Sequence, residues 1–302
     1  MQNSQFSSDF QSFLAPAKLN LFLHVTGQRA DGYHTLQTVF QLLDFYDTIH
    51  LKTTQTGEIV RVNDIANVPA NSDLCVRAAL ALKHATGCTQ GVEIALQKRI
   101  PIGGGLGGGS SDAATVLIAL NQLWKTNLSR NELMQIGLKL GADVPVFIFG
   151  QNAWAEGIGE QLTPIMLPTR YYVVLTPNVH VSTRDIFANS TLTKDTKPLK
   201  ITDFSSDVND NNVYGDIFST LRNDLEAVVC KEFPAVASTI KWLNRIELKG
   251  VGQARMSGSG ASVFVAVSSK ATADEFLTQK PDYISGFIAE SLLKHPHFEL
   301  AN

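Results

Sequence analysis

The sequence gathers residues suited to phosphate binding in one short segment. The run from Gly103 to Ser111 reads Gly-Gly-Gly-Leu-Gly-Gly-Gly-Ser-Ser and contains six of the chain's 22 glycines. Glycine adopts a positive φ without steric cost and lets the backbone approach a ligand closely. Backbone N–H groups that lead into the first turn of a helix form a ready anion site. Because a strand pattern precedes this run and a strong helix pattern follows it, we interpret it as a phosphate cradle rather than a flexible linker.

The spacing within the run separates the known kinds of phosphate loop. A P-loop requires a lysine after its glycines, and none follows Gly109. Gly103, Gly105 and Gly108 match the dinucleotide spacing only as any run of glycines would. That motif also needs a second strand that ends in Asp or Glu about 20 residues further on, whereas residues 121–140 have the pattern of helix and loop. An oxidoreductase that binds NAD is therefore a weak alternative, and measurable NAD binding would support it.

The residues around the loop carry a more specific pattern. From Pro101 to Ala114 the proline, the leucine, the serine pair and the alanine pair stand in register with the phosphate loop of a kinase superfamily. This superfamily contains galactokinase, homoserine kinase, mevalonate kinase and phosphomevalonate kinase. The resemblance implies ATP as the phosphoryl donor and a fold of two α+β halves with the active site in the cleft between them. It assigns ATP binding to Pro101, Ile102, Gly103, Gly104, Gly105, Leu106, Gly107, Gly108, Gly109, Ser110 and Ser111.

Three further motifs resemble one branch of this superfamily. They are Ala15–Leu21, Gly32–His34 and Leu140–Phe147. That branch transfers a phosphoryl group to the tertiary 2-hydroxyl of a methylerythritol unit linked to cytidine diphosphate, in the non-mevalonate route to isoprenoids. The resemblance covers about residues 14–159 and resumes in two short segments, but nothing between 189 and 221 can be matched. It implies a small-molecule cytidine diphosphate substrate as the partner of this chain.

The resemblance places Lys18 and Asp143 at the catalytic positions. A tertiary alcohol has a pKa far above 7, so a base must take its proton as the new P–O bond forms. We expect Asp143 to be that base, and Lys18 to hold it ionised and to stabilise charge on the transferred phosphoryl group. Composition alone would instead favour non-catalytic roles, with Asp143 as a carboxylate at a helix end or turn and Lys18 as a solvated strand residue.

The same resemblance assigns five residues to the acceptor. Asn20 lies two residues after Lys18, on the same face of a strand, so it can bind the acceptor's hydroxyls. Tyr33 and His34 follow a glycine turn and are expected to stack on the cytosine and hydrogen-bond it. Phe187 is expected as the second stacking ring and Thr183 as a nearby polar contact. The alternative for all of them is ordinary turn closure and helix packing.

The serines of the loop, the metal ion, a second glycine turn and the adenine pocket are assigned less specifically. One of the serines Ser110 and Ser111 is expected to be the helix N-cap, and the other to reach phosphate or Mg²⁺. Mg²⁺ is expected on chemical grounds because it neutralises the β and γ phosphates of ATP, although its protein ligands stay open. The segment Ser257–Gly260 resembles a second glycine turn of the superfamily that packs against the phosphate loop. Residues 71–74 and Lys98 are possible walls of the adenine pocket.

The elements that must position these residues mix strands and helices without a regular β-α-β alternation, so the predicted class is α+β. We predict two domains, 1–161 and 162–302, joined near the proline-containing segment 162–170, and a polar loop at 194–212. Period-two and helical patterns predict strands at residues 17–25, 35–43, 48–54, 58–62, 92–97, 153–157, 171–176 and 262–267, and helices at 73–84, 113–123, 130–141, 185–190, 224–230, 236–245 and 272–279. Ser72 is the predicted N-cap of the helix at 73–84 and Gly87 its predicted stop, and Ser129 with Glu132 is predicted to form the capping box of the helix at 130–141.

Composition limits the other possibilities. Of the 302 residues, 44% are hydrophobic and 18% charged, which is typical of a globular protein that buries a sizeable core. The formal net charge of −3 provides no basic field for nucleic acid or for an anionic membrane surface. Three scattered cysteines and a polar start without a signal-peptide pattern indicate a cytoplasmic protein. The sequence leaves the oligomeric state open.

Two alternatives remain beside the oxidoreductase. The first is another kinase of the same superfamily with a different acceptor. The second is a non-catalytic descendant, which would be expected to have lost Lys18, Asp143 or the glycine loop, and all three are present.

Overall fold

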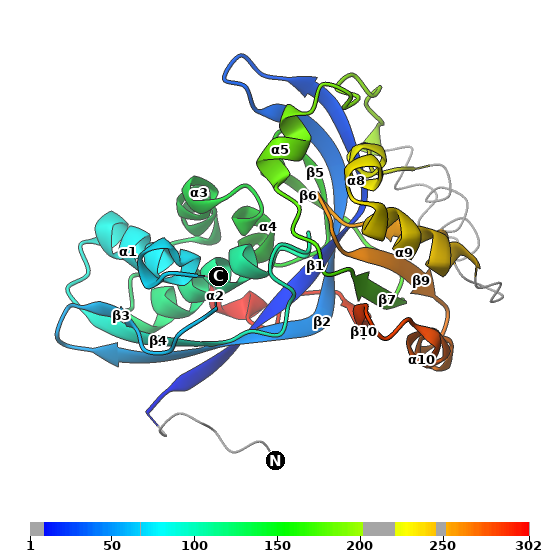
Figure 1. The fold of residues 1–302 in the computed structure, drawn as a ribbon. Coiled ribbons are helices and arrows are strands. Elements are labelled where there is room, and N and C mark those ends of the chain that lie inside the picture. Colours follow the sequence, from blue (N-terminus) through cyan, green and yellow to red (C-terminus); the bar gives the residue numbers. More distant parts are fainter. Residues whose placement is uncertain (1–8, 67, 202–220, 246–251, 302) are drawn as a thin grey trace.

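A long antiparallel hairpin forms the centre of the molecule (Figure 1). The computed structural model describes residues 9–66, 68–201, 221–245 and 252–301. In the hairpin, β1 (Gln11–Gln28) pairs with β2 (His34–Thr54). The sequence predicts two separate strands, 35–43 and 48–54, where the structure has the single strand β2, so this prediction is wrong. The pairing of β1 with β2 shifts register between Pro16 and Ala17 and then continues, so β2 is not interrupted. Proline has no N–H to donate, which favours an irregularity at this point.

The hairpin belongs to a larger sheet. Within the described residues ten strands are joined in the order β3, β4, β2, β10, β7, β9, β8, with β1 and β5 also paired to β2, and β6 paired to β5. The pair β3 and β4 is parallel, and the other strand pairs are antiparallel. The remaining strands are β3 (Ile59–Arg61), β4 (Gly91–Gln97), β5 (Ala153–Glu156), β6 (Gln161–Pro164), β7 (Tyr171–Thr176), β8 (Arg255–Met256), β9 (Val263–Val267) and β10 (Ser285–Leu292). This mixture confirms the α+β class. The sequence patterns do not predict β6, β8 or β10.

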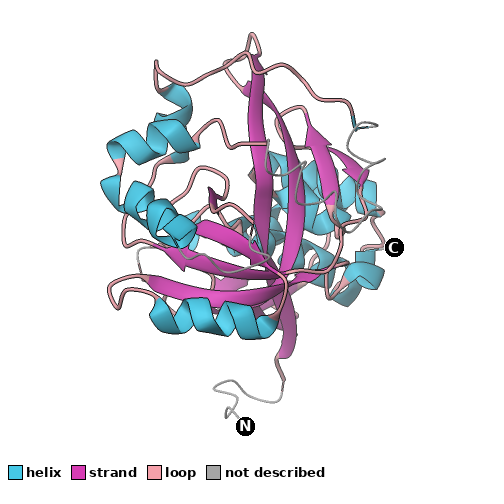
Figure 2. Cartoon of the chain, turned by 90° about the vertical axis from the view of Figure 1, so that its right-hand side faces the viewer, coloured by secondary structure: helices cyan, strands magenta, loops and turns pink. Residues whose placement is uncertain are grey.

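Helices flank the hairpin on both sides (Figures 1 and 2). Helices α1 to α4 lie to one side of it and α8 to α10 to the other. Among the residues described, no helix combines the length and the apolar character that crossing a membrane requires. The helices are α1 (Leu74–Thr86), α2 (Gly108–Leu123), α3 (Arg130–Leu140), α4 (Val144–Phe149), α5 (Thr183–Ala188), α8 (Glu226–Glu232), α9 (Pro234–Arg245) and α10 (Lys270–Gln279), with short 3-10 turns η1 (Ala70–Ser72) and η2 (Phe298–Ala301).

Local sequence signals account for several helix ends. The capping box of Ser129 and Glu132 opens α3, and Gly87 ends α1 in the left-handed conformation with a φ of 68°, both as predicted. The N-cap of α1 is Asp73, whose carboxylate accepts from the Cys75 N–H at 2.8 Å. The prediction of Ser72 as this cap is wrong, because Ser72 closes the preceding 3-10 turn.

The hairpin contributes to the cores of both halves. Phe13 of β1 packs in the core beneath α1 to α4, whereas Leu23 and Val25 of the same strand pack in the core with α8 to α10. A third apolar cluster around Phe22 and Trp154 lies along the hairpin. The division into domains 1–161 and 162–302 stays a prediction; β6 runs across that boundary, and the part of the predicted loop from residue 202 to 212 lies outside the described residues.

The last described residues return to the first half, where η2 contacts α2 and α4 (Figure 1). The His295 N–H donates to the Gly150 carbonyl at 2.8 Å, and the Leu14 N–H donates to Nε2 of His297 at 2.8 Å. Arg130 of α3 donates to the Phe298 carbonyl at 2.7 Å. The C-terminal segment therefore completes the packing of the half that carries the glycine loop.

Candidate active site

A cavity of about 1140 Å³ is lined by residues from both halves of the chain. One wall contains the glycine loop and the start of α4, and the other contains α5 and the turn after β8. Most residues assigned to chemistry from the sequence line it: Lys18, Asn20, Tyr33, His34, Pro101, Ile102, Gly103, Gly104, Gly105, Leu106, Gly107, Gly108, Gly109, Ser110, Asp143, Thr183 and Phe187.

Alternate glycines of the loop have left-handed backbone. Gly103, Gly105 and Gly107 have φ values of 71°, 73° and 73°. A Cβ atom on Gly105 would lie 2.1 Å from the Ser257 carbonyl oxygen, and one on Gly107 would lie 2.8 Å from the Phe147 ring. Both positions therefore need glycine for two reasons: the backbone φ is positive, and there is no room for a Cβ atom.

The turn Ser257–Gly260 packs against this loop, as expected. The Ser257 hydroxyl donates to the Gly105 carbonyl at 3.0 Å, and the Ser262 N–H donates to the Gly104 carbonyl at 3.1 Å. The Asn20 N–H in turn donates to the Ser257 hydroxyl at 3.2 Å. The glycine loop, β1 and the turn Ser257–Gly260 are thus hydrogen-bonded to one another.

The loop continues directly into α2. The N-cap is Gly107, and no side chain caps the helix, so the expectation of a serine cap is wrong. The helix starts at Gly108, which places both serines inside its first turn. Ser110 lines the cavity; Ser111 does not, and its buried hydroxyl has no hydrogen-bond partner among the described residues. The Ser111 N–H donates to the Gly107 carbonyl at 2.8 Å, so the N–H groups of Gly108, Gly109 and Ser110 are the ones that can bind an anion at this helix start.

Lys18 is a buried lysine, not a solvated strand residue. Its side chain is 2% exposed, and its Nζ lies 2.5 Å from Oδ1 of Asn20 and 3.3 Å from Oδ2 of Asp143. Nζ also lies 5.4 Å from the centroid of the Phe40 ring. A charge this buried requires such partners, because an unpaired ammonium in the interior is costly. Asn20 is fixed in turn by donating from Nδ2 to Thr38 Oγ1 at 3.0 Å.

Asp143 is the N-cap residue of α4, but its side chain makes no capping hydrogen bond. The structure gives this helix no side-chain cap, and the Asp143 side chain is 38% exposed. Its carboxylate is held by Lys18 on one side and open to the cavity on the other. A substrate hydroxyl can therefore reach a carboxylate that a buried cation already orients.

The aromatic residues expected at the acceptor gather at one end of the cavity. His34 stacks on Phe187 with ring centroids 5.2 Å apart and an interplanar angle of 26°. Tyr33 is 60% exposed beside them, and Thr183 Oγ1 lies 2.6 Å from Ser259 Oγ. Burial, and then the charge of Lys194, lower the pKa of His34. A largely neutral imidazole, able to donate and accept, faces this end of the cavity at neutral pH.

Sequence reasoning missed two basic residues in the cavity wall. Arg184 of α5 and Lys194 both line the cavity, and neither has an acidic partner among the described residues. Lys194 lies in the stretch predicted as a polar loop, where nothing in the sequence distinguishes it from an ordinary solvated lysine. Their positive charge makes this end of the cavity suited to an anionic ligand.

The opposite end of the cavity has an apolar wall next to the glycine loop. Ile65, Val68, Leu74 and Leu96 line it, together with Ser72, Asp73 and Lys98. This is the region that the sequence analysis marked for the adenine base. Apolar side chains of this kind suit a nucleobase.

No group of three His, Cys, Asp or Glu side chains within the described ranges could hold a metal ion. The oxygen donors that line the cavity include the Ser110 hydroxyl and the Asp143 carboxylate. These oxygen donors fit a Mg²⁺ ion that arrives with the nucleotide, since Mg²⁺ usually keeps several waters and shares its shell with phosphate oxygens.

The fold and the site define a GHMP kinase. Residues 73–151 match the family described as GHMP kinases N terminal domain, and residues 210–280 match GHMP kinases C terminal. A solved mevalonate kinase that is 17% identical shares the fold, with a TM-score of 0.68 over 93% of this chain and 99% of that one. The resemblance inferred from the glycine loop is confirmed.

More similar proteins define the branch. A curated 4-diphosphocytidyl-2-C-methyl-D-erythritol kinase of Paraburkholderia phytofirmans is 53% identical over 96% of each chain, and one of Burkholderia ambifaria is 52% identical over the same share. A crystal structure of 4-(cytidine 5'-diphospho)-2C-methyl-D-erythritol kinase, 30% identical, superposes with a TM-score of 0.76 over 93% of this chain and 99% of that one. The chain belongs to the family of the 4-diphosphocytidyl-2-C-methyl-D-erythritol kinases.

Proposed function

We propose that this protein transfers the γ-phosphoryl group of ATP to the 2-hydroxyl of 4-diphosphocytidyl-2-C-methyl-D-erythritol, in the synthesis of isoprenoid precursors by the non-mevalonate route. The names of its relatives support the acceptor. The observation that carries the chemistry is the approach of Lys18 Nζ to Asp143 Oδ2, at 3.3 Å, in a cavity also lined by the glycine loop.

Asp143 is the base in this proposal. Its open carboxylate oxygen takes the proton of the acceptor's hydroxyl as the hydroxyl oxygen bonds to the γ-phosphorus. At the same time the bond from that phosphorus to the β–γ bridging oxygen of ATP breaks, and ADP leaves. Lys18 orients the carboxylate before the reaction and stabilises negative charge on the transferring group during it. Asn20, hydrogen-bonded to Lys18, is placed to orient the acceptor's hydroxyl groups.

The glycine loop and the first turn of α2 bind the phosphates of ATP. Their backbone N–H groups supply donors without introducing a mobile side chain. Ser110 and Asp143 would hold a Mg²⁺ ion that arrives with the nucleotide, and the ion would neutralise charge on the β and γ phosphates.

The acceptor's cytidine diphosphate is assigned to the other end of the cavity. Tyr33, His34 and Phe187 are proposed to stack on the cytosine and hydrogen-bond it, with Thr183 as a polar contact. Arg184 and Lys194 are proposed to face the diphosphate, because they are the basic side chains of this part of the lining. We also propose a cytoplasmic location, supported by the free state of Cys75, Cys88 and Cys230.

ADP release in the presence of ATP and Mg²⁺ tests this function. The acceptors to compare are 4-diphosphocytidyl-2-C-methyl-D-erythritol, mevalonate, homoserine and galactose. We expect turnover with the cytidine compound alone. Turnover with only one of the others would retain the kinase and reject the acceptor, and binding of NAD without any turnover would reject both.

A further inference from the structure

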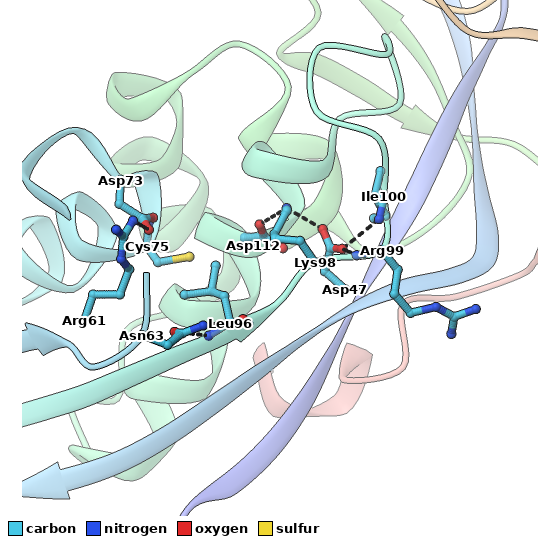
Figure 3. Close-up of polar contacts among 10 residues, drawn as sticks. All are labelled: Asp47, Arg61, Asn63, Asp73, Cys75, Leu96, Lys98, Arg99, Ile100 and Asp112. Atoms are coloured by element: carbon cyan, nitrogen blue, oxygen red, sulfur yellow. Dashed lines mark hydrogen bonds and ion pairs between the residues drawn. The ribbon is translucent and has the colours of Figure 1, made fainter. Parts of the chain in front are cut away.

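A buried cluster of three charged side chains lies at the base of the glycine loop (Figure 3). Asp47 comes from β2, Lys98 follows β4, and Asp112 is the fifth residue of α2. Their side chains are 0%, 18% and 4% exposed, respectively. Because Lys98 precedes the loop and Asp112 follows it, the cluster joins the two ends of the phosphate-binding segment.

The contacts link both ends of the loop through one ammonium group. Lys98 Nζ lies 2.5 Å from Asp47 Oδ2 and also contacts Asp112 Oδ2. The other oxygen of Asp47 accepts from the backbone N–H groups of Arg99 at 2.5 Å and Ile100 at 2.8 Å. Asp47 thus fixes the chain as it enters the loop, and Lys98 ties that point to the helix that leaves it (Figure 3).

The charges of the cluster are set by burial and by mutual attraction. Burial opposes the charge of Lys98, but Asp112 and Asp47 outweigh it and raise the pKa of Lys98 to about 12. Burial raises the pKa of Asp112, the charge of Lys98 opposes this rise, and Asp47 adds to it. Lys98 is therefore cationic throughout the neutral range. Breaking such a buried pair leaves a charge without compensation.

The loop needs an external constraint because of its composition. Glycine loses more conformational freedom on ordering than any other residue. A loop of six glycines that was free at its ends would have to be ordered by the nucleotide itself, and the affinity for phosphate would fall accordingly. The hydrogen bonds from Ser257 and Ser262 hold the middle of the loop at Gly105 and Gly104, and the Lys98 cluster is the constraint at its ends.

We propose that Lys98 is a positioning residue for the phosphate loop: by joining Asp47 to Asp112 it fixes both ends of the loop, so that the N–H groups are arranged for phosphate before the nucleotide binds. The inference rests on the proposed function, since it assumes that the loop binds phosphate. It predicts that Lys98 supports the affinity for the phosphates and not the affinity for the adenine base.

The test compares the binding of ADP and adenosine to the full-length protein by calorimetry. In Lys98→Met and in Asp112→Leu the affinity for ADP should fall by at least about tenfold, equal to 1.4 kcal/mol, while the affinity for adenosine stays nearly unchanged. The matched control is Arg130→Met, which removes a half-buried basic residue that ties other segments together. It should alter neither affinity.

Three outcomes would overturn the inference. Equal losses for adenosine and ADP would make Lys98 part of the base pocket. Unchanged or tighter ADP binding in Asp112→Leu, where the lysine is kept but the tie is lost, would make Lys98 a direct phosphate ligand. A wild-type protein that binds ADP no better than adenosine would reject the phosphate role of the loop, and with it the proposed function.

Hydrogen exchange of the ligand-free protein provides a second readout that does not depend on binding. Backbone amides of residues 103–109 should exchange faster in Lys98→Met and Asp112→Leu than in wild type, and Arg130→Met should leave them unchanged. Wild-type protection of these amides in both cluster variants would contradict the proposal.

Discussion

The Nζ atom of Lys18 lies 3.3 Å from Oδ2 of Asp143, although the lysine is 2% exposed and the aspartate 38%. The buried cation comes from the central strand β1, and the accessible carboxylate comes from the start of a short helix more than a hundred residues later. A base must be oriented and yet reachable by substrate, and this pair meets both conditions.

Asp143→Asn should abolish proton removal while keeping the shape of the site. We expect kcat to fall by about 10²- to 10⁴-fold and the KM for ATP to change little, because the carboxylate is assigned to the acceptor's hydroxyl. Steady-state kinetics check this. An unchanged kcat would remove Asp143 as the base, and an equal change in both KM values would indicate general disruption of the site.

Gly105→Ala should damage the loop from within. The new Cβ would lie 2.1 Å from the Ser257 carbonyl oxygen, at a backbone φ of 73°. We expect a loss of stability of about 1–3 kcal/mol from strain and overpacking, with a raised KM for ATP. Thermal unfolding and kinetics measure the two effects. Gly87→Ala, at a helix end with open space around it, is the control and should leave the KM for ATP unchanged. Wild-type stability of Gly105→Ala would contradict the described packing.

Tyr33→Ala should weaken binding of the acceptor and leave binding of ATP unchanged. Stacking of a base on an aromatic ring is worth about 1–3 kcal/mol, so the KM for the cytidine substrate should rise roughly tenfold. Tyr283→Ala, which removes another exposed tyrosine that is not part of the cavity lining, is the control. A parallel rise in the KM for ATP would argue against stacking on the cytosine.

Lys194→Gln should act through charge. We expect the KM for the acceptor to rise only about threefold at low ionic strength, because exposed charge pairs are weak, and the difference to disappear in high salt. Lys197→Gln, three residues along in the same stretch, lies outside the cavity lining and should have no effect. A salt-independent loss would mean that Lys194 acts by packing.

His295 should make stability depend on pH. Burial, and then the charges of His297 and Arg130, lower its pKa from 6.5 to about 3. Between these values the unfolded chain binds a proton that the folded chain does not, so stability falls as the pH drops below about 6.5, by about 1.4 kcal/mol per pH unit for this group. Urea unfolding between pH 5 and 7.5 should show a smaller slope for His295→Asn than for wild type. Equal slopes would contradict this assignment.

The sequence predicted the glycine loop, the α+β class and most helices, because these depend on local patterns. The capping box at Ser129 and the helix stop at Gly87 are examples. It could not predict β10, whose residues alternate poorly and whose partners, β2 and β7, are distant in the chain. The same limit hid the continuity of β2 across residues 44–47, where pairing to β1 continues beyond an irregular stretch.

The family resemblance predicted part of the candidate site, and the sequence could not predict the rest. Lys18, Asn20 and Asp143 line one cavity, as the family resemblance suggested. The prediction of a serine cap for α2 was wrong because this helix begins within the glycines, where helix propensity alone predicts no helix. Arg184, Lys194 and the link from Lys98 to Asp112 depend on tertiary proximity, which no spacing in the sequence records.

The most direct test of the account is ³¹P NMR of a reaction that contains the protein, ATP, Mg²⁺ and 4-diphosphocytidyl-2-C-methyl-D-erythritol. The account predicts one new phosphomonoester signal that grows in step with ADP, while the diphosphate signals of the acceptor are retained, and no such signal with Asp143→Asn. Formation of ADP with inorganic phosphate and no new ester, or an ester formed equally well by Asp143→Asn, would contradict it.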